Sequence, residues 1–364
     1  MQREIVFISS SLSSDKAVGL RSCYLIRALR KKGQRVSIIT SEDAGDEDTM
    51  TYFRLASNKS SNYLRIFKEI IWGLEIAFRL RRHNPKSLII YTLPPYLSYL
   101  VVRALFKKRA FITDVRDLYP EALAESNTLN YNGRFYKYLK STTEKILSRD
   151  IAVLAATKSI SKELNLTGDI EKYIYYNGYP DLPQDIGAKF EQYTIVFHGT
   201  FGKFQNIELL KELILATADK PIRWLLIGDG PKKALIENLE SNRVSLYSTL
   251  SNSETLKLVS KCHLGISLRT DDLLSRAAIP VKVFEFIGLE IKAVVTPISE
   301  GGALVEENLF GRQFENNIDS ILAFIQLDSK SYLKTNKEEF SSKREKFSRE
   351  YLSDECALKI LTKL

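Results

Sequence analysis

Short apolar segments alternate with amphipathic ones along the 364 residues of this chain, and this alternation is the strongest constraint on its fold. An apolar run of about four to eight residues followed by a helical pattern is typical of parallel sheets with crossover helices. We therefore expect an α/β protein. The predicted strands lie near residues 4–9, 35–40, 87–91, 110–114, 151–156, 172–176, 194–199, 222–227, 243–247, 263–268 and 292–296.

The chain is longer than one hydrophobic core usually supports, so two domains are expected. A proline-rich polar stretch, Gly178–Asp185, follows a predicted strand and separates the two series of strands. The boundary predicts a first domain at residues 1–178 and a second at residues 179–344.

Apolar residues make up 44% and charged residues 27% of the chain, as in soluble globular proteins. The cysteines, Cys23, Cys262 and Cys356, are far apart and form no metal-ligand cluster, which fits a reducing compartment. No apolar run approaches the about 20 residues that span a bilayer. We expect a cytoplasmic protein with neither a signal peptide nor a membrane span.

The net charge of +9 is concentrated in one window. Ten basic and two acidic residues lie between Asn62 and Ala110, which gives +8. Within it, Tyr63–Arg82 is amphipathic, with apolar residues from Ile66 to Phe78 on one face. One interpretation is a helix packed on a sheet; the other is a helix lying on an anionic membrane. No nucleic-acid-binding motif accompanies the charge, so no nucleic-acid partner is expected.

The segment Ile279–Gly302 carries the chemistry that we consider most specific. Lys282 and Glu285 are three residues apart and therefore neighbours on a helix. The turn Ser299–Gly302 opens another helix, where backbone amides and the helix dipole favour phosphate. A cation, a carboxylate for a ribose diol and an amide turn together suit a nucleoside diphosphate. An ordinary strand–helix unit with a solvated Lys and Glu is the alternative.

This segment resembles the donor site of the GT-B retaining glycosyltransferases of family 4, through Pro280, Lys282, Glu285 and Phe286. It departs from their pattern at Gly288, Glu290 and Lys292, which lie in the following turn. Further motifs of the family occur in the same order along this chain. Those at 91–95 and 115–121 are similar to motifs of a subgroup that builds bacterial surface polysaccharides. These motifs are Gly19–Arg21, Gly33–Val36, Tyr91–Pro95, Val115–Glu121, Tyr176–Gly178, His198–Lys203 and Leu226–Pro231.

The resemblance implies the GT-B fold, in which two Rossmann-like parallel-sheet domains face each other across a cleft. It also implies that a C-terminal helix at about 345–364 packs back on the first, acceptor-side domain. The implied activity is transfer of a hexose or N-acetylhexosamine from a nucleotide-sugar, preferably a UDP-sugar, to a glycan or polyprenyl-diphosphate-linked acceptor. No metal or other cofactor is implied. The implied place of action is the cytoplasm or the inner face of the cell membrane.

Ligands of open α/β sheets bind at the carboxyl ends of strands, which selects the donor-site candidates. The resemblance gives Glu285 the ribose hydroxyls and gives Lys282 and Lys203 the diphosphate. The family's first Glu falls at Ala277 here, and Asp271, Asp272 or Ser275 are possible substitutes. The other donor-binding candidates are Gly19, Gly199, Gly228, Gly230, Pro280, Val281, Gly301 and Gly302.

On the first domain, Asp117 is the candidate catalytic carboxylate for sugar or acceptor hydroxyls, with Arg116 and Glu121 beside it on the acceptor side. The alternative role for Asp117 is a helix N-cap partnered by Arg116. His198 and His263 fall inside predicted strands, where core packing is the expected role.

Two other functions remain open from the sequence. One is a nucleotide-sugar 2-epimerase, which shares the fold but usually carries several catalytic acids and a histidine that we cannot place here. The other is a non-catalytic glycan-binding or scaffold subunit, which the missing Glu at Ala277 favours slightly.

Overall fold

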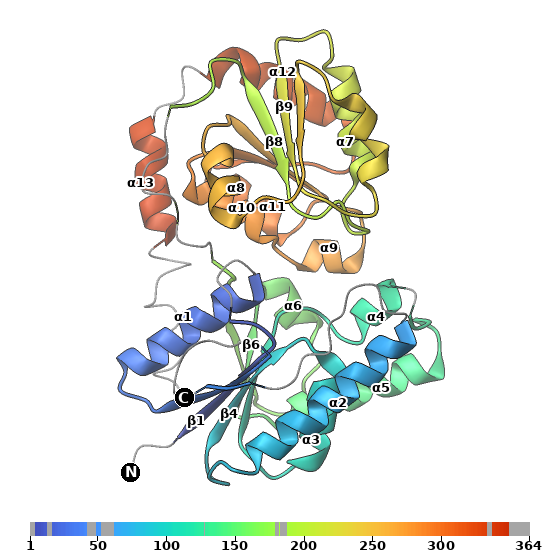
Figure 1. The fold of residues 1–364 in the computed structure, drawn as a ribbon, viewed down its shortest axis with the longest axis vertical. Helices are drawn as coiled ribbons and strands as arrows, with labels where there is room; N and C mark the ends of the chain where they lie inside the picture. The colour runs from blue at the N-terminus through green and yellow to red at the C-terminus, as the bar shows by residue number, and fades with distance from the viewer. Residues whose placement is uncertain are drawn as a thin grey trace. The chain divides into compact units, whose positions relative to one another are not determined.

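The computed structural model describes residues 4–12, 17–41, 49–51, 62–126, 128–178, 182, 188–332 and 337–348. It divides into two compact units, of which the first runs to Asn177 and the second begins at Gly178 (Figure 1). Most of the predicted linker lies outside the described residues. So does the helix predicted at 345–364 beyond Ser348.

The first unit is a parallel sheet with the order β3-β2-β1-β4-β5-β6-β7. The order reverses at β1, since β2 pairs with one side of β1 and β4 with the other. This is the Rossmann arrangement. The strands are β1 (Ile5–Ser9), β2 (Val36–Thr40), β3 (Thr49–Thr51), β4 (Leu88–Leu93), β5 (Phe111–Val115), β6 (Ala152–Ala155) and β7 (Glu171–Ile174).

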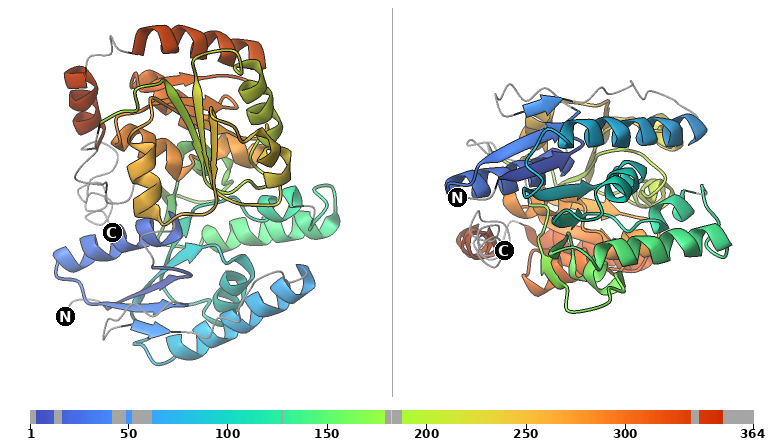
Figure 2. Two further views of the ribbon diagram at one scale, coloured as in Figure 1. Left: turned by 45° about the horizontal axis from the view of Figure 1, so that its top comes forward. Right: turned by 90° about the horizontal axis from the view of Figure 1, so that it is seen from below.

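Helices cover both faces of this sheet because alternate strand residues point to opposite sides (Figure 2). Phe7 and Ile90 pack with Leu25 of α1 on one face. On the other, Tyr99 of α3 hydrogen-bonds to Thr113 of β5 at 3.1 Å. The helices are α1 (Ala17–Lys31), α2 (Asn62–Leu80), α3 (Tyr96–Leu105), α4 (Glu121–Glu125), α5 (Arg134–Leu147) and α6 (Lys158–Glu163).

A buried ion pair fixes α1 to the sheet. The Arg21 guanidinium donates through Nε and Nη2 to the carboxylate of Asp114 on β5, with Nη2 2.5 Å from Oδ1. Both side chains are fully buried, and the guanidinium also lies 4.2 Å from the centre of the Tyr175 ring. Each buried charge of the pair is tolerated only while its partner is present, because a buried charge without a partner strongly destabilises the fold.

The second unit repeats the arrangement with the order β10-β9-β8-β11-β12-β13, which reverses at β8. Its paired strands also run parallel. The strands are β8 (Thr194–His198), β9 (Arg223–Ile227), β10 (Val244–Tyr247), β11 (Leu264–Leu268), β12 (Lys292–Thr296) and β13 (Gly311–Gln313). The helices are α7 (Ile207–Ala216), α8 (Asn252–Val259), α9 (Leu273–Ala277), α10 (Val281–Gly288), α11 (Glu300–Glu307), α12 (Ile318–Ser331) and α13 (Lys337–Phe347), with short 3-10 turns η1 (Lys233–Leu235) and η2 (Glu237–Leu239).

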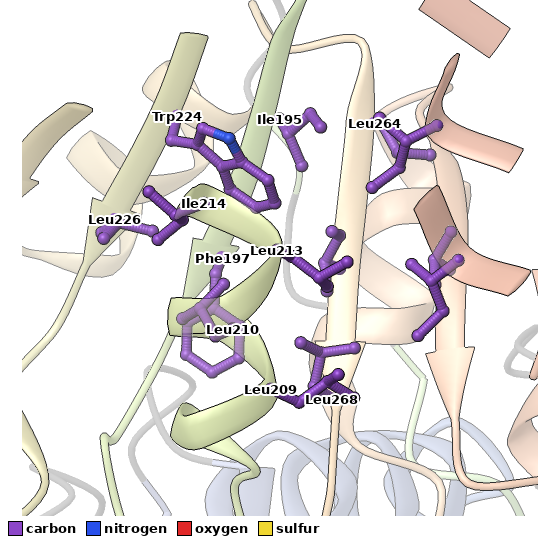
Figure 3. Packing of buried hydrophobic residues seen from close by; sticks show 14 of the residues in the cluster. Ile195, Phe197, Leu209, Leu210, Leu213, Ile214, Trp224, Leu226, Leu264 and Leu268 are labelled. Carbon is purple, nitrogen blue, oxygen red and sulfur yellow. The ribbon is translucent and has the colours of Figure 1, made fainter. Parts of the chain in front are cut away.

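The core of this unit lies between α7 and the sheet (Figure 3). Leu210 and Leu213 of α7 pack with Phe197 and Trp224 from neighbouring strands. The one polar atom of the Trp224 ring is satisfied, because Nε1 donates to Thr217 Oγ1 at 2.9 Å. Full burial of the indole ring therefore costs no hydrogen bond.

Helix α13 belongs to this unit by its contacts. Phe340 and Phe347 lie against Phe310, with ring centres 5.2 and 5.6 Å apart. Arg344 pairs with Glu290, which follows α10, at 3.1 Å.

The structure contains every strand that the sequence predicts, within two residues at each end, and adds β3 and β13. These two strands are only three residues long and lie at sheet edges. Neither contains an apolar run of the kind from which the other strands are predicted, since their sequences are Thr-Met-Thr and Gly-Arg-Gln.

The structure contradicts the first interpretation of the amphipathic segment, in which the apolar face of α2 packs on a sheet. The apolar side chains of Phe67, Leu74 and Phe78 are exposed, whereas the charged residues Lys68 and Glu69 are buried. The reason is the partner that α2 meets. It packs on α3, where the Glu69 carboxylate accepts from the Leu97 amide at 3.0 Å and so caps the start of α3.

We expect Asp114→Leu to lower the free energy of unfolding of the first unit by about 3–5 kcal/mol, because it leaves the Arg21 charge buried without its partner. Urea unfolding would measure this. Arg276→Ala, which breaks the exposed pair with Asp271 in the second unit, is the control and should change little. Equal effects of the two substitutions would contradict the assigned importance of the buried pair.

Candidate functional site

The strand order of the second unit reverses at β8, between β9 and β11. Loops that leave the two sides of such a point turn to opposite faces of the sheet, and ligands of doubly wound sheets bind there. The four segments predicted for the donor site all follow strands at this edge, and α10 follows one of them. They are Gly199–Lys203, Gly228–Pro231, Arg269–Ile279 and Ser299–Gly302.

The predicted donor-site glycines Gly228 and Gly230 hold two loops together. Both adopt positive φ, +147° and +153°. A Cβ on Gly228 would lie 2.0 Å from the Gly199 carbonyl oxygen, and one on Gly230 would lie 2.6 Å from that of Phe201. The backbone amide of Phe201 donates to Asp229 O at 2.9 Å. Only glycine allows these loops to approach so closely.

Lys282 lies in the first turn of α10 and points at the end of β8. Its Nζ is 3.3 Å from Gln205 Oε1 and 4.2 Å from the centre of the Phe197 ring. A Cβ on Gly199, whose φ is +110°, would lie 3.5 Å from the same nitrogen. The Lys282 side chain is therefore buried directly beneath the Gly199 turn, and the alternative of a solvated lysine is wrong.

Glu285 lies one turn further along α10 and is also buried. Its Oε2 is 3.4 Å from Nε2 of His198, the last residue of β8. The His198 ring meets Phe286 edge-on, with centres 5.3 Å apart. Phe286 can lie this close to the sheet because Gly265 on β11 has no side chain; a Cβ there would be 2.5 Å from the Phe286 ring.

Burial dominates the electrostatics of this pair. Burial and, less strongly, the nearby Arg269 charge lower the pKa of Lys282 to about 7, although Glu285 opposes both. Burial likewise raises the pKa of Glu285 to about 7, against the attraction of Lys282. Burial and the Lys282 charge lower the pKa of His198 to about 3, so that its imidazole is neutral. Perturbed groups of this kind are typical of functional sites.

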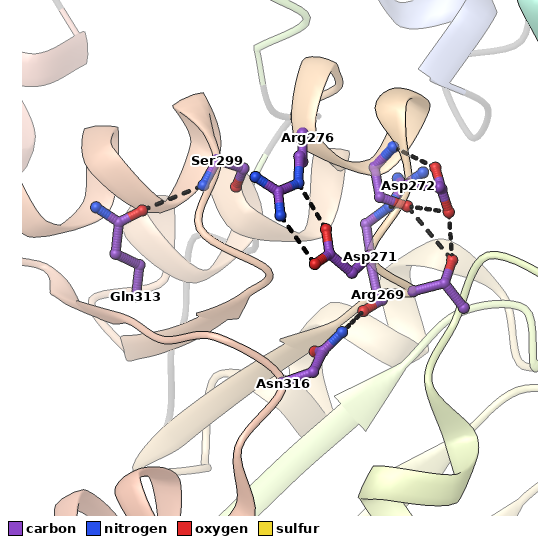
Figure 4. Close-up of polar contacts among 9 residues, drawn as sticks. Arg269, Asp271, Asp272, Arg276, Ser299, Gln313 and Asn316 are labelled. Atoms are coloured by element: carbon purple, nitrogen blue, oxygen red, sulfur yellow. Dashed lines mark hydrogen bonds and ion pairs between the residues drawn. The ribbon is translucent and has the colours of Figure 1, made fainter.

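The loop after β11 satisfies its own acidic groups (Figure 4). Asp272 caps α9, accepting from the Ser275 amide at 2.8 Å and from Thr270 Oγ1 at 2.6 Å. Asp271 pairs side-on with Arg276 at 2.6 and 2.8 Å. Ala277, where the family pattern has its first Glu, is buried. The three proposed substitutes for that Glu are thus already engaged within the loop.

The turn at Gly301–Gly302 begins α11, as predicted, but some of its backbone amides already donate hydrogen bonds within the protein. Ser299 caps the helix by accepting from the Gly302 amide at 3.2 Å, and its own amide donates to Gln313 Oε1 at 3.3 Å. Both glycines are buried, and a Cβ on Gly302 would be 2.5 Å from Gln313 Oε1. Close packing therefore accounts for the small residues.

The remaining donor candidates lie at the margins of this cluster. Pro280 is the N-cap residue of α10, in extended conformation, and Val281 is its first residue. Lys203 is exposed on the loop after β8. The structure thus places Lys282, Glu285 and Gly199 together and leaves Lys203 at the surface.

The acceptor-side candidates are in the first unit. Asp117 is exposed, and it is not a helix N-cap, because Pro120 occupies that position before α4. Arg116 is buried, and burial lowers its pKa to about 10. Glu121 pairs with Lys140 at 2.8 Å, which gives that carboxylate a structural partner. Gly19 is buried in the first turn of α1.

Three polar residues of the second-unit site are not among the predicted donor groups. His198 is buried, as expected, but its Nε2 faces Glu285. Gln205 contacts Lys282, and its backbone bridges to Arg269. Arg269 directly follows β11, which was the available signal, whereas His198 ends β8 and Gln205 lies in the loop after it.

No group of three or more His, Cys, Asp or Glu side chains among the described residues is arranged to hold a metal ion. No helix in the described ranges is long and apolar enough to cross a membrane.

No protein-family model and no curated protein matches the chain. Solved structures do match. A glycosyltransferase from Rickettsia africae has 15% identity and a TM-score of 0.65, over 100% of this chain and 97% of its own. WaaG, a glycosyltransferase involved in lipopolysaccharide biosynthesis, has 12% identity and a TM-score of 0.66, over 98% and 99%. Anabaena HepE in complex with UDP-glucose has 12% identity and a TM-score of 0.67, over 99% and 98%. Identities this low establish the fold alone, and the fold is that of the GT-B glycosyltransferases, built from two Rossmann-like parallel-sheet domains.

Proposed function

We propose that this protein is a retaining glycosyltransferase that takes a sugar from a nucleotide diphosphate donor. The observation that carries the proposal is the buried Lys282–Glu285 pair beneath the Gly199 turn, at the switch point of the second sheet. Leaving a lysine and a glutamate buried with few hydrogen-bond partners costs stability. A ligand that supplies both a diphosphate and a ribose diol would satisfy them.

The donor would be held by complementary groups. The Glu285 carboxylate would accept from the ribose hydroxyls, with His198 fixing its orientation at 3.4 Å. Lys282 would contact the diphosphate, and Arg269, whose charge acts on Lys282, would add to the positive potential. The Gly301 amide at the start of α11 and the exposed Lys203 are further candidates for phosphate contacts. We propose a UDP-sugar because HepE, which shares the fold, was crystallised with UDP-glucose.

Catalysis would be positional and electrostatic. As the bond between the sugar and the diphosphate breaks, negative charge grows on the leaving group, and Lys282 would stabilise it. The acceptor hydroxyl would attack from the same face of the sugar, so that the anomeric configuration is kept. Fixed cations perform the charge neutralisation in this scheme, and we propose that no metal is required.

The acceptor would be a glycan or a polyprenyl-diphosphate-linked sugar, in the synthesis of a surface polysaccharide. Asp117 remains the proposed group for sugar or acceptor hydroxyls, because its side chain is exposed while Arg116 and Glu121 are buried. A lipid-linked acceptor requires the enzyme to work as a peripheral protein at the inner face of the cell membrane.

A non-catalytic glycan-binding subunit is the second candidate. It is favoured by Ala277 and by the engagement of Asp271 and Asp272 in pairs within their own loop. Release of nucleoside diphosphate from UDP-, GDP- and dTDP-sugars, in the presence of membrane extract as acceptor source, separates the two. Turnover with any of the donors supports the enzyme, and nucleotide binding without turnover supports the subunit.

Glu285→Ala should weaken binding of the nucleoside diphosphate by about 1.5–3 kcal/mol, because hydrogen bonds to a charged group are lost. Titration calorimetry would measure this, with Glu307→Ala, an exposed position at the end of α11, as the matched control. Unchanged affinity in Glu285→Ala would remove this residue from the site.

Excess EDTA should leave the rate within about a factor of two, whereas Lys282→Ala should lower it about 100-fold or more. Lys257→Ala, at an exposed lysine of α8, serves as the control for general charge effects. Loss of activity in EDTA with rescue by Mg²⁺ or Mn²⁺ would overturn the metal-free mechanism.

The product should keep the anomeric configuration of the donor, and Asp117→Asn should lower turnover far more than nucleotide affinity. Proton NMR of the product and calorimetry of the variant would test the two statements. An inverted product would contradict the proposed stereochemistry, and a fully active variant would exclude Asp117 from the chemistry.

A further inference from the structure

Helix α2 carries a row of large apolar side chains on its outer surface. Phe67, Phe78 and Leu74 are 60%, 59% and 53% exposed, and Ile66 and Ile70 are 38% and 40% exposed. Their spacing of three and four residues places them on one face of the helix, along about 17 Å. We call these five residues the α2 ridge. An exposed apolar row of this length marks a surface that binds something.

The helix cannot rotate to bury this ridge, because its other side is committed to α3. The Glu69 carboxylate caps α3 at Leu97, and the Glu69 carbonyl accepts from Ser98 Oγ at 2.7 Å. Gly73 brings the two helices together, since a Cβ there would lie 2.7 Å from Val101 Cβ.

Positive charge gathers at one end of the ridge. α2 and α3 run in the same direction, as the contacts of Glu69 with Leu97 and of Arg109 with the Leu80 carbonyl show. Both helices therefore end side by side, and the exposed basic residues after each of them form one basic end. It consists of Arg81, Arg82, Lys86, Lys107 and Lys108. No acidic residue occurs in the sequence between Glu75 and Asp114.

We propose that the α2 ridge inserts into an anionic lipid bilayer, with the basic end against the phosphate headgroups. Glu4, whose carboxylate accepts from Ser87 and acts on Arg109, lies near this end and leaves it strongly basic. Apolar side chains beside a basic cluster match the interface of such a membrane, where apolar residues enter the acyl boundary and cations meet phosphates. A protein partner would need acidic groups to match the basic end, and a second copy of the same face would repel it. The biological role of this membrane contact rests on the proposed function, because the contact would bring the acceptor-side unit to a lipid-borne sugar. The contact itself does not depend on that function.

The test is co-sedimentation of the full-length protein with vesicles. We expect binding to phosphatidylglycerol–phosphatidylcholine vesicles at 0.1 M salt and at least tenfold weaker binding to phosphatidylcholine alone. The Debye length is about 10 Å at 0.1 M salt and about 3 Å at 1 M salt. Binding to the anionic vesicles should therefore also be at least tenfold weaker at 1 M salt. Binding that does not depend on lipid charge or salt concentration, or no binding at all, would overturn the proposal.

Matched variants separate insertion from surface adsorption. Leu74→Ser should reduce binding about tenfold, whereas Leu215→Ser, at a 53% exposed leucine of α7, should not. Arg81→Glu with Arg82→Glu should abolish binding, and the same charge change at Lys257 and Lys330, exposed on α8 and α12, should have a much smaller effect. In a Trp72→Phe background, which removes the native tryptophan of α2, fluorescence of Leu74→Trp should be quenched by brominated acyl chains, and that of Leu215→Trp should not.

Two further readouts distinguish the possible failures. The affinity for nucleoside diphosphate, measured by calorimetry, should be the same in the ridge variants as in wild type. If wild type itself does not bind nucleoside diphosphate, that result counts against the proposed function and not against membrane insertion. Sedimentation velocity without lipid should show a monomer for wild type and Leu74→Ser alike. A dimer that dissociates in Leu74→Ser would assign the ridge to self-association and overturn the membrane proposal.

Discussion

The site of the second unit depends on the desolvation of two charged side chains by one short helix. α10 is eight residues long, and all but its first are buried, including Lys282 and Glu285. It reaches this depth because Gly265 lets the Phe286 ring lie on β11. The loops around it are fixed by backbone hydrogen bonds and by glycines that admit no side chain. The unusual protonation behaviour of the pair follows from this packing, since opposite charges on a solvated helix surface would keep ordinary pKa values.

Much of the fold followed from the sequence because the central strands of both sheets are buried on two faces. Such strands appear as continuous apolar runs, and runs such as 292–296 and 194–198 were placed almost to the residue. The α10 motif was also predicted, because Lys282 and Glu285 are three residues apart and a helix makes side chains at that spacing neighbours. Their proximity to each other was predictable, and their burial was not.

The elements that the sequence misassigned are those whose environment is set by distant partners. α2 has a strong apolar face, and periodicity predicts that this face is buried; the capping of α3 by Glu69 reverses the orientation. Glu121 appeared to be free for an acceptor, but Lys140 and Tyr136 come to it from another helix. His198 is buried as expected, but the sequence does not show that α10 places Glu285 at its ring. Contacts of this kind span 15 to 87 residues, beyond any local pattern.

The matched pKa values of Lys282 and Glu285 have a consequence for how an anion enters the site. Near pH 7 both groups of the empty pair titrate, because burial lowers the pKa of Lys282 to about 7 and raises that of Glu285 to about 7. A diphosphate favours the ammonium form, and a ribose diol favours the carboxylate form. A fall in pH protonates Glu285, and a rise in pH neutralises Lys282. The packing of α10 therefore tunes the site to neutrality, since ligand affinity would be greatest near pH 7 and would decline on either side.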